Sequence, residues 1–184
     1  LAIEISELLK DKRNGEKGIT KYDTDEIDKI FKQIQNNSKI EFSEEQKEAI
    51  KLAFTEPIVI ITGGPGTGKT TIVHAILEMY FKLNKDNSTL AEAVALLAPT
   101  GRAAKRLKES TKMSASTIHK FLGYQGENFF QYNKNNRTNA RLIIVDEASM
   151  MDLPLASRLF TSMHPACRII IVGDVDQLPS VGPG

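Results

Sequence analysis

Apolar residues along this chain form two kinds of pattern, short unbroken runs and longer stretches with helical spacing. The unbroken runs, each of strand length, are residues 58–62, 93–98, 141–145 and 168–172. The stretches with helical spacing are about 44–55, 69–82, 153–163 and a segment after Gly101. Runs that are apolar throughout and alternate with helices are typical of a parallel sheet covered on both faces. We therefore predict an α/β fold with three layers and a mainly parallel sheet.

A short helical segment precedes this alternation. Residues 1–12 and 23–36 each have apolar positions with helical spacing, and a polar stretch separates them. Because this segment is too short for a core of its own, we predict that residues 1–40 are the helical tail of a preceding amino-terminal region. Residues 41–184 are then the main domain, and Ser43-Glu44-Glu45-Gln46 fits a capping box that opens its first helix. Since the chain starts at Leu1 rather than Met, we interpret it as a piece of a longer protein.

The polar stretches predict turns, loops and one further helix. Residues 84–89 are expected to be a polar turn, and residues 123–140, rich in Asn, Gln and Gly, an exposed loop or hairpin. A short helix is expected to begin at Ser116 or Thr117. The carboxyl ends of parallel strands meet at one edge, where ligands bind in open α/β sheets. The polar clusters that follow the four runs should therefore converge on that edge.

Composition sets limits rather than a function. The chain has 184 residues and a net charge of +1, so a nucleic-acid site must be a local patch. Its apolar runs are far too short to span a membrane, and no membrane partner is expected. The single cysteine, Cys167, excludes an internal disulfide and fits a packed core position in a protein of the reducing cytoplasm.

The strongest chemical signal follows the first apolar run. Residues 63–70 read Gly-Gly-Pro-Gly-Thr-Gly-Lys-Thr, a complete phosphate-binding loop between a strand and a helix. The glycines let backbone N–H groups turn toward anionic oxygens at the start of the helix. Lys69 can reach the β- and γ-phosphates as a flexible charge, and Thr70 can offer its hydroxyl to Mg²⁺. The pattern predicts a site for ATP and Mg²⁺ rather than a plain glycine-rich turn.

An acidic pair, Asp146-Glu147, closes the third apolar run. An aspartate at this place can hold Mg²⁺, directly or through water, opposite Thr70. Glu147 can accept a proton from an attacking water. Such a pair is by itself common as a solvated strand end, but behind a full phosphate loop we interpret it as a Walker B pair. A small-molecule kinase uses similar parts and needs no such glutamate, since its acceptor is not water.

Several other polar residues have two interpretations each. Gln46 can cap a helix, which its spacing favours, or its amide can read the hydrogen-bonding edge of adenine. Gln177 can orient water near a γ-phosphate or belong to an ordinary acidic turn over residues 173–179. Four cations within residues 105–112 suit DNA backbone phosphates, although a solvated helix face is the commoner interpretation. His119 has the same ambiguity, because surface and helix-packing histidines are common.

Taken together, these motifs resemble, in order, superfamily 1 DNA helicases of the RecD type. The segments that carry the resemblance are residues 63–70, Ala98-Pro99-Thr100-Gly101-Arg102-Ala103-Ala104, Ser116-Thr117-Ile118-His119-Lys120-Phe121-Leu122, Val145-Asp146-Glu147-Ala148-Ser149-Met150 and Gly173-Asp174-Val175-Asp176-Gln177-Leu178-Pro179-Ser180-Val181-Gly182. The Ser43-Glu44-Glu45-Gln46 stretch is similar to the adenine-reading motif of that family. The resemblance spans about residues 42–184, and the related conjugative relaxase-helicases are the nearest alternative.

The resemblance implies the first RecA-like P-loop motor domain of an ATP-driven enzyme that moves 5′-to-3′ on single-stranded DNA. It implies that Lys69 binds the phosphates, that Glu147 is the general base and that Gln177 couples the γ-phosphate to DNA. Asp146 and Thr70 would serve Mg²⁺. The residues it places at ATP are Gln46, Gly64, Pro65, Gly66, Thr67, Gly68, Lys69, Thr70 and Thr71. The residues it places on the DNA backbone are Thr100, Gly101, Arg102, Thr117 and His119.

The resemblance also implies partners beyond this chain. In the family, a second RecA-like domain supplies arginine fingers and the other half of the ATP cleft, so residues 1–184 alone are expected to be nearly inactive. Single-stranded DNA and other subunits of a helicase–nuclease complex for repair and recombination are the candidate partners. Two other functions are a nucleotide or small-molecule kinase, which leaves residues 173–182 unexplained, and a non-catalytic nucleotide switch, which the intact Lys69, Thr70 and Glu147 disfavour.

Overall fold

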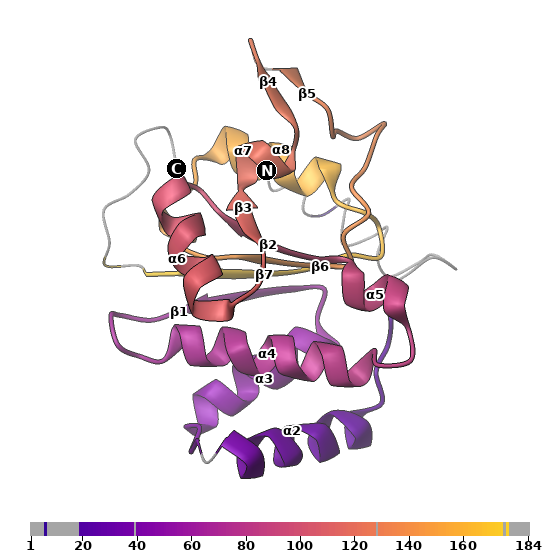
Figure 1. Cartoon of the computed structure of the whole chain (residues 1–184), viewed down its shortest axis with the longest axis vertical. Helices are drawn as coiled ribbons and strands as arrows, with labels where there is room; N and C mark the ends of the chain where they lie inside the picture. The colour runs from indigo at the N-terminus through magenta and orange to yellow at the C-terminus, as the bar shows by residue number, and fades with distance from the viewer. Residues whose placement is uncertain (1–5, 7–18, 39, 128, 175, 177–184) are drawn as a thin grey trace.

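The apolar runs form one sheet whose strands all run parallel (Figure 1). The structure is a computed structural model that describes residues 6, 19–38, 40–127, 129–174 and 176. The strand order is β1-β7-β6-β2-β3. The strands are β1 (Ile58–Thr62), β2 (Val94–Ala98), β3 (Ala115–Thr117), β6 (Leu142–Val145) and β7 (Arg168–Gly173). The predicted parallel sheet is confirmed.

Helices cover both faces of this sheet (Figure 1). One face packs against α3 (Glu44–Thr55), α4 (Lys69–Leu83) and α6 (Gly101–Thr111), and the other against α7 (Ile118–Phe121) and α8 (Leu153–Ser162). Helix α2 (Thr24–Ser38) lies outside α3 and α4 and packs against these two helices. Strand β6 shows why its run is apolar throughout. Leu142 and Ile144 belong to the first core, whereas Ile143 and Val145 belong to the second. The three predicted layers are therefore present.

The structure adds one strand and one helix that the pattern did not predict, and it contains a hairpin that the pattern allowed. β3 pairs parallel with Leu96–Ala98 at the edge of the sheet, where only a helix start was expected. A short helix, α5 (Ser88–Glu92), replaces the end of the predicted polar turn and is capped by the Asn87 side chain. The expected loop or hairpin contains an antiparallel pair, β4 (Tyr124–Gly126) and β5 (Phe129–Phe130), which projects from the body in Figure 1. The helix predicted over residues 1–12 falls almost wholly outside the described residues.

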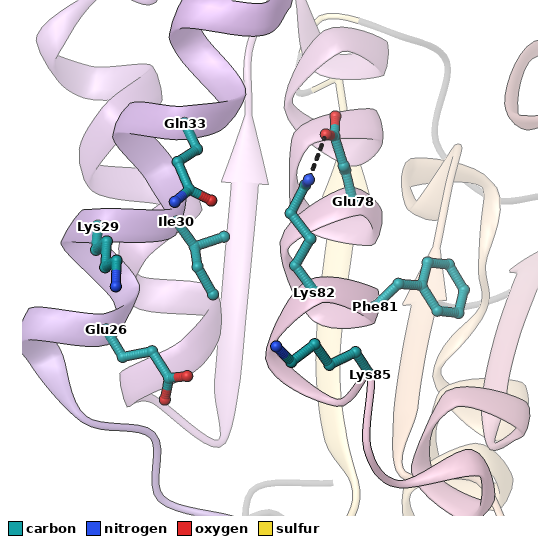
Figure 2. Close-up of a pocket in the computed structure, with 8 residues that line it drawn as sticks. All are labelled: Glu26, Lys29, Ile30, Gln33, Glu78, Phe81, Lys82 and Lys85. Carbon is teal, nitrogen blue, oxygen red and sulfur yellow. Dashed lines mark ion pairs between the residues drawn. The ribbon is translucent and has the colours of Figure 1, made fainter.

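Helix α2 packs against the main domain rather than standing apart from it. Its apolar side chains Ile27, Ile30, Phe31 and Ile34 belong to the same core as α3 and α4. Figure 2 shows the groove between α2 and α4, a cavity of about 570 Å³, with the apolar Ile30 and Phe81 and the Glu78–Lys82 ion pair of 3.6 Å on its walls. The division of the chain at residue 40 remains a prediction.

The amino-terminal end of the sheet is closed by a buried arginine. Arg168, at the start of β7, is 4% exposed and donates to the carbonyl oxygens of Glu56 and Thr20. Its guanidinium lies 5.5 Å from the centre of the Tyr22 ring, whose hydroxyl bonds with the buried Asn84. Cys167 beside it is buried and donates to the Arg168 carbonyl, as expected for a core cysteine. Among the described residues, no helix is both long and apolar enough to cross a membrane.

Candidate functional site

The loop over residues 63–68 connects β1 to α4 at the carboxyl edge of the sheet. Gly66 and Gly68 have φ angles of +76° and +84°, a left-handed conformation that side chains with a Cβ disfavour. Gly68 is the residue that precedes α4, and it offers no side chain to cap the helix. The first amides of α4 are therefore not bonded by a cap side chain, and the helix start favours an anion.

Lys69 is held inside this loop. Its half-buried ammonium donates to the carbonyl oxygens of Gly63 at 2.5 Å and Gly64 at 2.7 Å. The Thr67 hydroxyl donates to the same Gly64 oxygen at 2.9 Å. These bonds place the positive charge at the centre of the loop. A bound phosphate would accept the Lys69 hydrogen bonds in place of the two carbonyl oxygens. Thr70 and Thr71 follow on the first turn of α4, with Thr70 exposed.

Gln46 contacts the phosphate loop directly. It completes a capping box, because the Ser43 N–H donates to its Oε1 at 3.0 Å and its own N–H donates to the Ser43 hydroxyl at 3.3 Å. Its Nε2 donates to the Thr67 carbonyl at 2.9 Å. A cavity of about 360 Å³ joins Gln46 to Lys69 and to the apolar Ile60. The side chain is thus a helix cap, as its spacing favoured, and it also ties α3 to the loop.

Asp146 and Glu147 lie at the end of β6, and β7 separates them from β1. Burial raises the pKa of the Asp146 carboxyl, while the Glu147 N–H, which donates to Asp146 Oδ1 at 2.9 Å, lowers it. The negative charge of Glu147 raises the same pKa and the positive charge of Lys69 lowers it. The structure therefore brings the acidic pair within electrostatic reach of the phosphate loop, although the pair does not line the Gln46 cavity.

The backbone at Glu147 is strained. Its φ of 53° and ψ of 38° are left-handed, which is uncommon for a residue with a side chain. The turn leads into a short 3-10 helix, η1 (Ala148–Met150), where the Ser149 hydroxyl is buried without a hydrogen-bond partner among the described residues. Strain and an unpaired buried hydroxyl next to an acidic pair are features that cluster at functional sites.

The donors at this edge suit Mg²⁺ bound together with a nucleotide. Thr70 and Asp146 offer a hydroxyl and a carboxylate, which are hard oxygen ligands. The described part of the chain contains no group of three or more His, Cys, Asp or Glu residues arranged to hold a metal by themselves. Mg²⁺ commonly binds through one or two protein oxygens plus phosphates and water, so this sparse donor set fits the ion.

The residues predicted to contact DNA lie on two neighbouring turns of the same edge. Thr100 caps α6 by accepting from the Ala103 N–H at 3.2 Å, and Thr117 caps α7 by accepting from the Lys120 N–H at 3.2 Å. Ala98 is paired with Thr117 in the sheet, which brings the two turns together. Gly101, Arg102 and His119 are exposed. A capping hydroxyl still carries a proton that it can donate to a phosphate.

The segment that follows β7 continues the carboxyl edge. Asp174, after β7, is buried and accepts from the Asp176 N–H at 3.0 Å, whereas Gln177 lies outside the described residues. The sequence also gave no reason to select Tyr124, Phe130 and Arg158, which surround His119 with aromatic and cationic groups. The only available signal was the presence of aromatic residues in a polar hairpin.

Most of this chain is similar to known protein families and relatives. The profile of a family described as AAA domain matches residues 46–183. The ATP-dependent RecD2 DNA helicase of Deinococcus radiodurans is 42% identical over 142 residues, which are 77% of this chain and 19% of that protein. The RecBCD enzyme subunit RecD of Mycobacterium tuberculosis is 36% identical over 157 residues, 77% of this chain and 27% of that protein. The chain thus spans only part of these relatives.

A solved structure has a similar arrangement. The Pif1 helicase from Candida albicans matches with a TM-score of 0.53 and 25% identity, over 77% of this chain and 34% of that one. The match extends the likeness from sequence to three dimensions.

Proposed function

The chain belongs to the AAA domain family, and we propose that it is the ATP-hydrolysing motor domain of a RecD-type DNA helicase. The RecA-like P-loop fold predicted from the sequence is confirmed by the parallel sheet and the Pif1 likeness. One observation carries the proposal, namely the loop between β1 and α4 that holds the Lys69 ammonium on the Gly63 and Gly64 carbonyls, at the same edge of the sheet where Asp146 follows β6. A cation for phosphates and a carboxylate for Mg²⁺ are the parts that phosphoryl transfer needs at one place.

The proposed mechanism begins with an exchange at the loop. Lys69 gives up its bonds to the Gly63 and Gly64 carbonyls and binds the β- and γ-phosphates, together with the amides at the start of α4. Glu147 then accepts a proton from the attacking water. Mg²⁺, which Thr70 and Asp146 would hold, supplies positive charge for the phosphate oxygens. We further propose that Gln46 contacts adenine and that Gln177 senses the γ-phosphate.

The proposed route of DNA follows the turns that begin α6 and α7. Thr100, Gly101, Arg102, Thr117 and His119 contact the backbone of single-stranded DNA, along which the motor moves 5′-to-3′. Such contacts suit a protein that binds without reading sequence, since phosphates carry no sequence information directly. One relative is named as a RecBCD subunit, and other subunits of a helicase–nuclease complex are therefore proposed partners. A cytoplasmic location is part of the same proposal.

We also propose that residues 41–184 form one side of the ATP cleft and that residues 1–40 end a preceding region. A second RecA-like domain elsewhere in a longer protein would supply the arginine fingers. Because an arginine finger contributes about 10³–10⁵ in rate, the 184-residue chain alone is expected to hydrolyse ATP very slowly and to unwind nothing.

The test is steady-state ATP hydrolysis by the longer protein that contains this chain, with and without single-stranded DNA. The proposal predicts strong stimulation by DNA and release of inorganic phosphate. Replacement of Arg102 by Ala should lower the stimulated rate more than the basal rate, whereas Lys29→Ala, which removes an exposed cation on α2, is the matched control and should change neither. Phosphate transfer to another acceptor, without any effect of DNA, would instead identify a kinase.

A further inference from the structure

A small pocket lies between α7, the β4–β5 hairpin and the start of α8. Its cavity of about 140 Å³ is lined by His119, Tyr124, Phe130, Asp152, Pro154 and Arg158, with Leu155 at its base, and is called the aromatic pocket below. This volume is well below that of a typical site for a drug-sized ligand and suits one planar ring.

The rings of the aromatic pocket contact one another at inclined angles, with the planes of His119 and Tyr124 75° apart and those of Tyr124 and Phe130 44° apart. Their centroids are 4.9 Å apart between Tyr124 and Phe130, 5.3 Å between His119 and Tyr124, and 6.0 Å between His119 and Phe130. The Arg158 guanidinium lies 4.5 Å from the centre of the Phe130 ring. These are the distances at which aromatic pairs and cation–π pairs attract one another, so the site is held in shape by its own contacts.

Burial divides the pocket into a floor and an open side. Phe130 is 8% exposed and belongs to the core with Ile118 and Leu122. Tyr124 is 46% exposed, and His119 is exposed as well. Phe130 therefore packs the hairpin onto the body, whereas Tyr124 and His119 keep aromatic surface in contact with water.

The pocket adjoins the turns already described. Helix α7 follows β3 at the carboxyl edge, and β3 is paired with β2, whose end leads to Thr100 and Arg102. Lys120 and Arg158 are exposed beside the pocket and add positive charge. The one acidic member, Asp152, accepts from the Leu155 N–H at 2.8 Å as the cap of α8. The surroundings thus suit an anionic chain that carries flat apolar groups.

We propose that the aromatic pocket binds one unpaired nucleobase of single-stranded DNA, with its face stacked on Tyr124 and its edge toward His119, because the planes of these two rings are 75° apart. Arg158 faces the adjacent phosphate while it also contacts Phe130. Stacking on aromatic side chains accepts every base, and it adds to the affinity that phosphate contacts provide. This inference rests on the proposed function, since it adds a contact to bases to a DNA path that otherwise touches only the backbone.

The test compares two oligonucleotides of equal length and charge, one of deoxythymidine and one of abasic sites, in binding to the longer protein. Wild type should prefer the oligonucleotide with bases by about 5- to 150-fold, the range of about one to three kcal/mol for a stacked base. Tyr124→Ala should lose most of this preference, and Tyr124→Phe should keep it. The slope of log affinity against log salt should not change, because no phosphate contact is removed.

Phe129→Ala is the matched control. Phe129 lies on the same hairpin and is 58% exposed, but it does not line the pocket. Its replacement should leave both affinities unchanged. An equal loss in Phe129→Ala and Tyr124→Ala would overturn the assignment to this pocket.

The remaining outcomes separate the pocket from the proposed function. If wild type binds both oligonucleotides equally, the motor binds DNA but the base contact is wrong. If wild type binds neither, both the function and the pocket are wrong. If Tyr124→Ala keeps the preference for bases but no longer binds a partner subunit, the pocket receives a protein side chain and the proposal is overturned.

Discussion

Arg168 at the start of β7 and Asp146 at the end of β6 are charged side chains removed from water at opposite edges of one sheet, and their surroundings differ. Arg168 is buried, and it has two carbonyl acceptors and an aromatic ring around it. Asp146 is half-buried beside a second carboxylate, and burial raises its pKa. The Arg168 side chain is satisfied internally, whereas the carboxyl edge keeps polar groups that a ligand would satisfy.

The loop at the carboxyl edge extends this contrast. Within the described part of the chain, the Lys69 ammonium bonds only to carbonyl oxygens of its own loop, and Glu147 has a left-handed conformation next to the Ser149 hydroxyl, which has no partner there. Lys69 can exchange its loop carbonyls for a ligand more readily than Arg168 can exchange its acceptors, because Arg168 joins segments that are far apart in the chain. Burial of a charged side chain does not by itself identify a functional site. The hydrogen-bond partners that the protein provides for that side chain are more informative.

The largest expected effect is the loss of ATP hydrolysis in the Lys69→Ala variant of the longer protein. Loss of the ammonium removes a charge-assisted contact to the β- and γ-phosphates, so nearly all ATP hydrolysis should disappear and ATP binding should weaken. Phosphate release and binding of a fluorescent ATP analogue measure the two effects. Turnover at the wild-type rate would show that Lys69 does not bind the phosphates, and the proposed difference between the two edges would then be wrong.

Glu147→Gln should separate catalysis from binding at the same edge. The amide cannot accept the proton of the attacking water, so hydrolysis should slow by about 10²–10⁴-fold. Mg²⁺-ATP binding should persist, because Asp146 is unchanged. The opposite pattern, weak binding with normal turnover of bound ATP, would show that Glu147 is not the base.

Arg168→Met tests the amino-terminal edge. The substitution leaves the carbonyls of Glu56 and Thr20 without their donor, and the free energy of unfolding should fall by about 1–3 kcal/mol. ATP hydrolysis per folded molecule should not change. Arg141→Met is the control, since among the described residues the half-buried Arg141 side chain donates only to the exposed Asn139 carbonyl, at 3.2 Å. Urea unfolding of both variants measures the difference. Equal losses would contradict a special role of Arg168.

Asp146→Asn should have the smallest effect on stability, and a favourable one. The raised pKa means that the ionised carboxyl destabilises the folded state, a penalty that is absent at low pH, grows as the pH rises from the unfolded pKa and is complete above the folded pKa. At neutral pH the variant should gain less than about 1 kcal/mol, because one pKa unit is about 1.4 kcal/mol and water screens a half-buried group. The gain should vanish below about pH 4. A loss of stability at neutral pH would contradict it.

Much of the fold followed from the sequence because its main signals are local. The β6 run is apolar at every position since successive residues enter two different cores, and the phosphate loop needs its glycines at fixed places. β3 was missed because its three half-buried residues gain strand character only from pairing with Leu96–Ala98. The aromatic pocket was missed because Arg158 reaches Phe130 only through packing of α8 against the hairpin.

The central claim is that the carboxyl edge, unlike the amino-terminal edge, is completed by a nucleotide. The most direct measurement is the thermal unfolding of the longer protein with and without Mg²⁺-ATP, for wild type, Lys69→Ala and Arg168→Met. Nucleotide at about 100 times its dissociation constant should stabilise wild type by about 2.7 kcal/mol. Arg168→Met should start lower and gain the same amount, and Lys69→Ala should gain almost nothing. An equal gain in Lys69→Ala would contradict the account.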